Sequence, residues 1–223
     1  MKLRGIFPAL LTPFDAKGAL NEESLAALIE SLLGEGVHGF YVGGSTGEGL
    51  LMHLDERRRL VEVTLQACRG RARVIAHVGA NATQDAVALA EHAAGAGVDA
   101  VSTLPPLFFR VDDDAVVEHY RRVAAVGCPL LAYHIPALTG HRVTPDLMRR
   151  LADLPGFIGL KFTDSDFFNL RNLIDDGAGR LRAYVGEGRL TDDPLDTFGC
   201  RAVAEIPRLQ QLMQHVCLNG YEH

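Results

Sequence analysis

The stretch Phe157-Ile158-Gly159-Leu160-Lys161-Phe162-Thr163 is apolar apart from its lysine and its final threonine, and it directly follows Pro155-Gly156. A short apolar run bounded by turn residues predicts a strand that is covered on both faces. Burying an ammonium group is costly, so we expect Lys161 either to pair with an acid or to have a lowered pKa. A neutral amine can attack a ketone and form an imine. The ordinary alternative is a lysine that reaches solvent from the strand end.

Short apolar runs of this kind alternate with segments of helical spacing along the whole chain. The runs cover residues 6–12, 40–42, 74–78, 101–104, 130–135, 157–163, 181–185 and 202–206. Eight strand and helix units without a linker imply parallel strands joined by right-handed crossovers. We therefore predict one α/β domain over residues 1–223, a (β/α)8 TIM barrel with an atypical end from about residue 186. The alternative is an open doubly wound sheet, whose GxGxxG fingerprint after the first strand is missing.

The composition is that of an ordinary soluble globular protein. The 223 residues are 48% hydrophobic and 22% charged, with a formal net charge of −6, and that length suffices for one large core. The acidic balance argues against a nucleic-acid partner, and we expect Arg57-Arg58-Arg59 to form a solvated helix face. No run is long enough to span a membrane, and no signal peptide is expected. Four cysteines without metal spacing predict reduced thiols in a cytoplasmic protein: Cys68, Cys128, Cys200 and Cys217.

A glycine-rich loop follows the run 40–42. Gly43-Gly44-Ser45-Thr46-Gly47 can turn tightly and present backbone N–H groups, together with the hydroxyls of Ser45 and Thr46, to a small anion. Taken alone, this loop is more typical of a turn with a hydroxyl that caps a helix than of an anion site. It becomes informative because the carboxyl ends of barrel strands face one mouth, where active sites lie.

Tyr133 and Thr163 are the other side chains expected at that mouth. Tyr133 ends the run before the lysine strand, so it would lie beside Lys161 and could shuttle a proton. Strand alternation places Thr163 on the same side as Lys161, where it could bond a substrate hydroxyl. The nine histidines include no HExxH pair and are expected to be surface or satisfied core residues. The acidic run Asp112-Asp113-Asp114 fits a helix N-terminus better than a metal site.

Five stretches, in order from about residue 3 to about residue 175, together resemble one enzyme family. They are Leu11-Thr12-Pro13-Phe14, Tyr41-Val42-Gly43-Gly44-Ser45-Thr46-Gly47-Glu48, Ala76-His77-Val78-Gly79, Tyr133-His134-Ile135-Pro136-Ala137-Leu138-Thr139-Gly140 and Gly159-Leu160-Lys161-Phe162-Thr163-Asp164. The combination is similar to the N-acetylneuraminate lyase branch of the pyruvate-dependent class I aldolases, a family that also contains dihydrodipicolinate synthase.

The resemblance implies a (β/α)8 barrel in which Lys161 forms a Schiff base with pyruvate or a 2-oxo acid. Tyr133 would relay the proton, and Ser45 and Thr46 would hold the carboxylate. No metal or organic cofactor is expected. The resemblance also implies a homo-oligomer, a tetramer or a dimer, with the adjacent pair Phe108-Phe109 either at the subunit contact or capping the local core.

The end of the chain departs from the family pattern. A Gly-x-Asp-Glu stretch that binds sugar hydroxyls is replaced by Gly186-Glu187-Gly188, where Gly186 and Glu187 are the candidate substitutes. A Gly-Ser pair reads Ala204-Glu205, and most of the family's extra C-terminal helices are expected to be lacking. The segment Pro136-Ala137-Leu138-Thr139 contains no arginine for a second carboxylate, which favours the lyase over the synthase.

The leading hypothesis is therefore reversible Schiff-base cleavage of a 2-oxo sugar acid, such as N-acetylneuraminate, to pyruvate and N-acetylmannosamine. A second hypothesis keeps the imine chemistry but takes another substrate, as in other pyruvate-dependent aldolases or a dihydrodipicolinate synthase-like condensation. A third is a catalytically impaired relative that only binds a small carboxylate, because fold resemblance does not guarantee activity.

Overall fold

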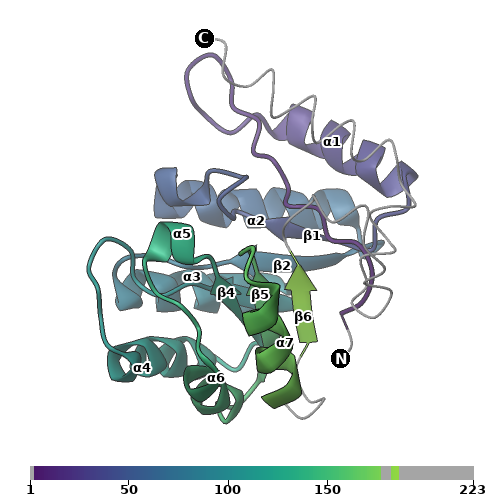
Figure 1. The fold of residues 1–223 in the computed structure, drawn as a ribbon. Coiled ribbons are helices and arrows are strands. Elements are labelled where there is room, and N and C mark those ends of the chain that lie inside the picture. Colours follow the sequence, from purple (N-terminus) through teal and green to yellow (C-terminus); the bar gives the residue numbers. More distant parts are fainter. Residues whose placement is uncertain (1–2, 177–181, 186–223) are drawn as a thin grey trace.

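A parallel sheet is the centre of the molecule, which a computed structural model describes over residues 3–176 and 182–185. Its strands lie side by side in the order in which they occur in the sequence (Figure 1). They are β1 (Gly39–Val42), β2 (Arg73–His77), β3 (Ala100–Thr103), β4 (Leu130–His134), β5 (Phe157–Phe162) and β6 (Arg182–Val185). Successive parallel strands joined by crossovers are the arrangement of a (β/α)8 barrel, so the predicted fold class is confirmed. The predicted strand at 202–206 and the segment from 186 onward lie outside the described residues.

The first predicted strand, residues 6–12, runs beside β1 but pairs with it only through one parallel bridge, between Ala9 and Tyr41. The N–H of Tyr41 donates to the carbonyl of Pro8 at 3.0 Å, and the N–H of Leu10 donates to the carbonyl of Tyr41 at 2.9 Å. Pro8 has no N–H to contribute, so the ladder cannot continue through it. The segment therefore occupies the place of the first strand without forming a full one.

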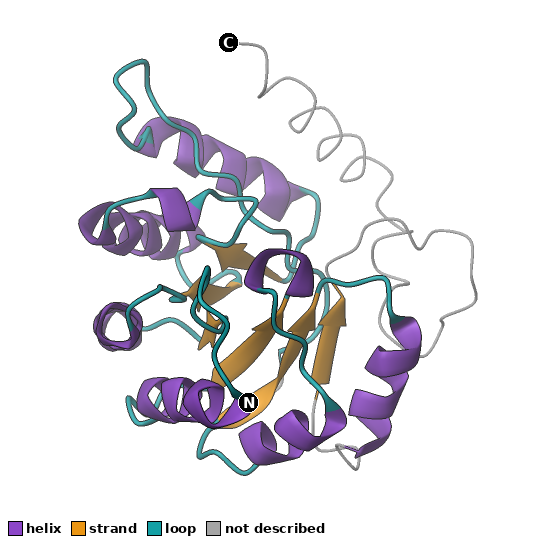
Figure 2. Ribbon diagram, turned by 60° about the vertical axis from the view of Figure 1, so that its left-hand side comes forward, coloured by secondary structure: helices purple, strands orange, loops and turns teal. Residues whose placement is uncertain are grey.

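Helices surround the strands on the outside of the curved sheet (Figure 2). The longer helices pack on one another in turn: α1 on α2, α2 on α3, α3 on α4, α4 on α6 and α6 on α7. They are α1 (Glu22–Gly34), α2 (Leu54–Cys68), α3 (Thr83–Ala96), α4 (Asp113–Ala124), α5 (Pro136–Thr139), α6 (Pro145–Ala152) and α7 (Phe167–Asp176), with a 3-10 turn at Gly49–Leu51. The acidic run begins α4 as predicted, because the Asp112 carboxylate accepts from the N–H of Ala115. The short α5 was not predicted.

Both faces of the sheet are buried, as the near-continuous apolar strands require. Alternate strand residues such as Phe40 and Val74 pack against the helices in the larger core. The intervening residues, among them Tyr41, Ile75 and Tyr133, face inward and form a smaller second core with Leu131 and Leu104. Polar side chains of the candidate active site, described below, belong to these inward-facing residues.

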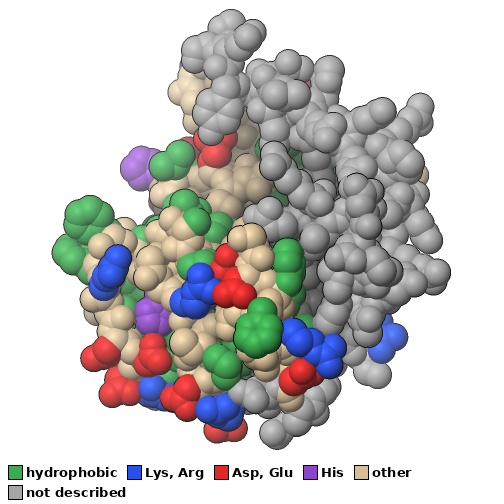
Figure 3. All heavy atoms as spheres, in the orientation of Figure 1, with side chains coloured by type: hydrophobic (Ala, Val, Ile, Leu, Met, Phe, Trp, Pro, Cys, Tyr) green, Lys and Arg blue, Asp and Glu red, His purple; other side chains and the backbone are tan. Residues whose placement is uncertain are grey.

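The arginine triplet does not form a uniformly solvated face, and that prediction was wrong for one member. Arg58 and Arg59 are on the surface and pair with Asp55 and Glu22, whereas Arg57 is only 5% exposed. On the face drawn in Figure 3, acidic and basic side chains lie next to one another instead of forming separate patches. Within residues 3–176 and 182–185, no helix has both the length and the apolar character needed to cross a membrane.

Two buried histidines make the fold sensitive to acid. Burial lowers the pKa of His77 to about 3 and that of His119 to about 4, whereas an unfolded chain protonates both near pH 6.5. Between pH 6.5 and 4 the unfolded state therefore binds more protons, and the unfolding free energy falls as pH falls. We expect a slope of about 3 kcal/mol per pH unit from the two groups together. Chemical unfolding at stepped pH measures it, and His119→Gln should reduce the slope by about 1.4 kcal/mol per pH unit; an unchanged slope would contradict the assignment.

Candidate active site

Lys161 and Tyr133 lie side by side at the carboxyl ends of β5 and β4. The two residues are direct partners in the parallel ladder, and the Lys161 Nζ is 3.5 Å from the centroid of the Tyr133 ring. The amine also donates to Thr163 Oγ1 at 3.3 Å, which confirms that these two side chains lie on the same side. Tyr133 is 2% exposed and Lys161 is half-buried. The lysine therefore combines a sheltered stem with an amine at the mouth of the sheet.

The glycine-rich loop meets the tyrosine directly. Ser45 Oγ and the Tyr133 hydroxyl are hydrogen-bonded at 3.1 Å, although 88 positions separate the residues in the sequence. Gly43 has a φ of +69°, a left-handed conformation that glycine adopts without strain. Ser45 and the neighbouring Thr46 are exposed on the resulting turn. Ser45 of the loop, Tyr133 and Lys161 thus lie next to one another.

The loop is held at both ends by side chains from other elements. At its far end Thr12 Oγ1 donates to the carbonyl of Gly47 at 2.6 Å. At its near end the carbonyl of Gly43 is hydrogen-bonded to His77 Nδ1 at 3.0 Å. Fixed ends restrict the directions in which the Ser45 and Thr46 groups can point. Such preorganisation is what binding of a small anion requires.

Tyr41 is a site residue that the sequence analysis missed. Its ring centroid is 4.8 Å from Lys161 Nζ and 5.8 Å from the Tyr133 ring, at an interplanar angle of 73°. Its hydroxyl donates to Ser102 Oγ at 3.0 Å, and burial raises its pKa well above the ordinary value. The signal was available, since inward-facing residues alternate along a strand and Tyr41 shares that face.

Two aromatic rings therefore border the lysine amine. A cation over a ring face is favoured by about 0.5–2 kcal/mol, depending on how far it is desolvated. That preference applies to an ammonium and to the protonated imine that an amine forms with a ketone. The same surroundings thus suit the resting lysine and a cationic covalent intermediate.

His134, the buried residue after Tyr133, is hydrogen-bonded to the end of the strand that carries Lys161. His134 Nδ1 accepts from the N–H of Val143 at 3.2 Å, so Nε2 carries the proton and bonds Asp164 at 3.2 Å. The carbonyl of His134 accepts from the N–H of Thr163 at 2.8 Å. Burial lowers the pKa of His134, which keeps the ring neutral. Thr163 is thereby held in place at the end of β5.

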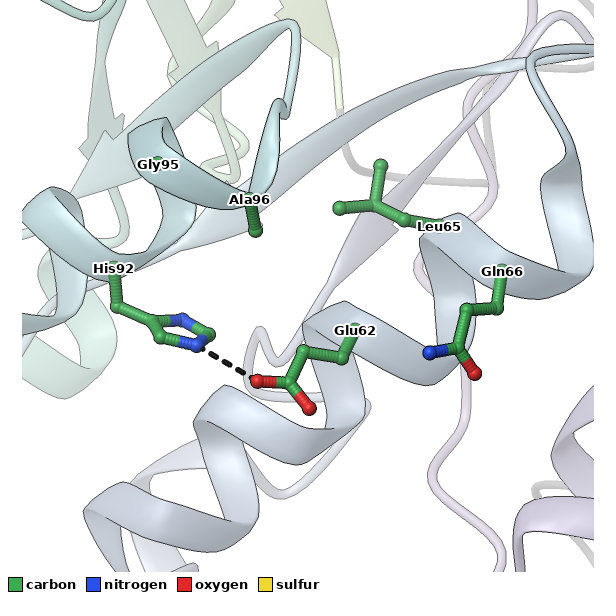
Figure 4. A pocket seen from close by; sticks show the side chains of 6 residues that line it. All are labelled: Glu62, Leu65, Gln66, His92, Gly95 and Ala96. Carbon is green, nitrogen blue, oxygen red and sulfur yellow. Dashed lines mark hydrogen bonds and ion pairs between the residues drawn. The ribbon is translucent and has the colours of Figure 1, made fainter.

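The predicted sugar-binding residues Gly186 and Glu187 lie outside the described residues. Among those described, no three His, Cys, Asp or Glu side chains cluster closely enough to hold a metal ion. A groove of about 530 Å³ lies between α2 and α3, and across it His92 and Glu62 are hydrogen-bonded at 3.0 Å (Figure 4). Neither Lys161 nor Tyr133 lines this groove.

Known proteins resemble the chain over most of its length. The N-acetylneuraminate lyase of Rhizobium meliloti (strain 1021) is 41% identical over 174 residues, which are 78% of this chain and 58% of that relative. This chain therefore spans less than two thirds of the relative's length. The solved structure of CdNal from Clostridium difficile in complex with mannosamine is 27% identical with a TM-score of 0.84, covering 96% of this chain and 79% of that one.

A second solved structure is the chloride-inhibited dihydrodipicolinate synthase from Acinetobacter baumannii complexed with pyruvate. It is 28% identical, with a TM-score of 0.81 over 84% of this chain and 65% of that one. The sequence pattern of the Dihydrodipicolinate synthetase family matches residues 2–205. The match includes the glycine-rich loop, Tyr133 and Lys161. The chain belongs to the dihydrodipicolinate synthetase family.

Proposed function

We propose that this protein is a class I aldolase, a carbon–carbon lyase that reversibly cleaves a 2-oxo sugar acid such as N-acetylneuraminate to pyruvate and N-acetylmannosamine. The observation that carries the proposal is the amine of Lys161 over Tyr133, whose hydroxyl is bonded to Ser45. Nucleophile, proton carrier and anion-binding loop are then within reach of one small substrate. The naming of a 41% identical relative as an N-acetylneuraminate lyase supports the choice of substrate.

In the proposed reaction the neutral Lys161 amine adds to the ketone carbon, and loss of water gives a protonated imine. Ser45 and Thr46 hold the substrate carboxylate. Tyr133 relays the proton of the C4 hydroxyl: it accepts that proton while it passes its own phenolic proton to the substrate carboxylate, as the electrons of the C3–C4 bond move into the iminium and the aldehyde leaves. The relay then runs in reverse and returns one proton to C3 of the enamine, and water releases pyruvate from the resulting iminium and restores the amine. The iminium is the electron sink, so this chemistry requires no metal or organic cofactor.

Specificity for the sugar part is assigned to Thr163, Gly186 and Glu187. Thr163 already bonds the Lys161 amine and would hold a substrate hydroxyl near the reacting carbons. Gly186 and Glu187 stay a proposal based on the family resemblance. The exposed Leu138 of α5 stands in the stretch where the synthase branch has an arginine. An apolar side chain there cannot pair with a second carboxylate, which favours the lyase reaction.

Reductive trapping tests the covalent step. The chain has three lysines, Lys2, Lys17 and Lys161, so a modified residue can be mapped without ambiguity. Incubation with pyruvate and borohydride should add one pyruvate, less one water and plus two hydrogens, at Lys161 alone. Peptide mass spectrometry reads the result, with pyruvate-free and borohydride-free samples as controls. A folded protein that stays unmodified would reject the imine mechanism.

Other substrates are the second candidate, because the dihydrodipicolinate synthase complexed with pyruvate has a similar fold. Pyruvate release from N-acetylneuraminate, compared with release from shorter 2-oxo-3-deoxy acids, separates the two. A carboxylate-binding protein without turnover is the third, favoured by the altered sequence at Gly186-Glu187-Gly188. Trapped pyruvate without cleavage of any 2-oxo acid would identify it.

We also propose that the chain forms a homo-oligomer through the surface around Phe108 and Phe109. These side chains are 88% and 72% exposed and pack edge to face at 5.0 Å, so they do not cap the local core. An exposed aromatic pair is typical of a contact surface. Sedimentation velocity of the whole chain would show a dimer or tetramer, and a strict monomer would refute the proposal.

A further inference from the structure

His77 is a buried histidine of β2 whose tautomer the structure defines. Its Nδ1 lies 3.0 Å from the carbonyl oxygen of Gly43. A carbonyl can only accept, so Nδ1 carries the proton and the histidine is the donor. In the neutral ring Nε2 is then a bare acceptor, and it has no hydrogen-bond partner among the described residues. The single N–H of the neutral ring is thus donated to Gly43, the first residue of the glycine-rich loop.

The surroundings of His77 keep the ring neutral and in place. Burial lowers its pKa to about 3, helped by the nearby charges of Arg57 and Lys161. The ring packs edge-on against Tyr133, with the two centroids 5.7 Å apart. There is no spare room beside Nε2, because a Cβ added to Gly79 would lie 2.7 Å from that atom. A ring confined in this way can hold the Gly43 carbonyl in a fixed position.

The strand that carries His77 is itself anchored from α2. Arg57 is buried, and its guanidinium donates to the carbonyls of His77 and Gly79, at 2.8 Å each. Those two carbonyls flank the point where β2 ends, so the histidine cannot shift along the strand without breaking both bonds. A direct line of contacts thus leads from Arg57 through His77 to Gly43.

The same chain of contacts continues from Gly43 to Ser45 and to the hydroxyl of Tyr133. Gly43 and Gly44 connect directly to Ser45, whose Oγ is bonded to the Tyr133 hydroxyl. The space around Gly44 is closed, since an added Cβ would lie 2.6 Å from the Tyr41 ring. Because Gly44 has no room to move, a displacement of Gly43 should also displace Ser45.

We propose that His77 is a positioning residue for 2-oxo acid binding: its Nδ1–H holds the Gly43 carbonyl and thereby orients the Ser45 and Thr46 groups that receive the carboxylate. The inference rests on the proposed imine chemistry. His77 touches no reacting atom in this role and acts only through the loop. Its effect should therefore appear in the pyruvate concentration needed for imine formation more than in the rate of the bond-breaking step.

Two substitutions separate the hydrogen bond from mere packing. The amide nitrogen of asparagine can occupy the position of Nδ1, so His77→Asn keeps a donor to Gly43. The amide of glutamine reaches the position of Nε2, so His77→Gln loses that donor. Asparagine leaves the larger void, so a purely structural role predicts that His77→Asn is the more damaging change. The positioning role predicts the opposite order.

The experiment measures the pyruvate concentration that gives half-maximal borohydride trapping at Lys161 in the whole chain. We expect an increase of about 5- to 10-fold for His77→Gln, the effect of one lost hydrogen bond, and an increase of less than about 3-fold for His77→Asn. Thermal unfolding of each variant is recorded in parallel. The matched control is His119→Gln, which removes a buried histidine bonded to Thr83 and Thr103 and should leave half-maximal trapping unchanged.

Each outcome decides a different claim. Equal effects of the two His77 variants, or a larger effect of His77→Asn, would overturn the positioning role while leaving the imine chemistry intact. If the wild-type protein is not trapped at all, the proposed function fails first. Gly79→Ala gives an independent check, because the added methyl group must push the His77 ring, and it should raise half-maximal trapping in the same direction as His77→Gln.

Discussion

Replacing Lys161 with methionine is expected to abolish pyruvate trapping and to reduce cleavage by at least about 10⁴-fold, the scale seen when a covalent enzyme loses its nucleophile. Methionine keeps an unbranched apolar side chain that can still pack over the Tyr133 ring, but it has no amine to form an imine. The assays are borohydride trapping and pyruvate release from N-acetylneuraminate. The fold should persist, since methionine keeps the contact with the Tyr133 ring and the lost hydrogen bond to Thr163 is worth about 1 kcal/mol.

Lys17→Met is the matched control for this variant. Lys17 is exposed in the turn before α1, so its removal should change neither trapping nor turnover. If Lys161→Met retained turnover within about tenfold of wild type, covalent capture at this position would be wrong. Retained trapping at Lys2 or Lys17 in the variant would show that the label reports non-specific reaction of lysines.

Tyr133→Phe is expected to lower the rate of bond cleavage by about 10²–10⁴-fold, the usual contribution of a positioned proton carrier. Phenylalanine keeps the ring beneath the Lys161 amine but removes the hydroxyl that is bonded to Ser45. Imine formation with pyruvate should therefore survive while cleavage of the C3–C4 bond is lost. Single-turnover measurement of pyruvate release, next to borohydride trapping, distinguishes the two steps.

Tyr120→Phe is the control for losing a buried phenol. The Tyr120 hydroxyl donates to the carbonyl of Thr103 at 2.9 Å and also bonds the backbone of Tyr133. Its loss should reduce the unfolding free energy by about 1–3 kcal/mol, and because the Tyr133 hydroxyl is kept, turnover should fall far less than in Tyr133→Phe. Wild-type turnover in Tyr133→Phe would remove the tyrosine from the mechanism. Equal loss of trapping and cleavage would instead assign it to substrate binding.

Much of the fold could be predicted because its signals are local. The apolar run around Lys161 and the other apolar runs of the chain have the length of buried strands. Asp112 caps α4 where the acidic run begins. Tyr133 and Lys161 were placed together because consecutive strands of a parallel barrel pair in order. The register that makes them direct partners depends in addition on an irregularity at the start of the strand pair, where Leu130 lies opposite Phe157 but Leu131 lies opposite Gly159. Without it, Tyr133 would lie opposite the residue before Lys161.

Arg57 shows where local signals were available but misinterpreted. It lies on the α2 face that also carries the buried residues Leu60, Val61 and Thr64, three, four and seven positions further on. The charged neighbours Arg58 and Arg59 suggested a solvated face, but the helical period turns them away from the core. Burial of a guanidinium is acceptable here only because the carbonyls of His77 and Gly79 accept its hydrogen bonds.

The order of the elements and the kinds of side chain at the strand ends follow from the sequence, because periodicity and turn chemistry act over a few residues. The bonds that make these side chains a site join distant positions: 34 residues separate His77 from Gly43, and 88 separate Ser45 from Tyr133. Their geometry depends on how the strands curve and which face each presents. Only the packed sheet, in which buried polar groups must find partners, determines that His77 bonds Gly43 and that the Tyr41 ring lies 4.8 Å from the lysine amine.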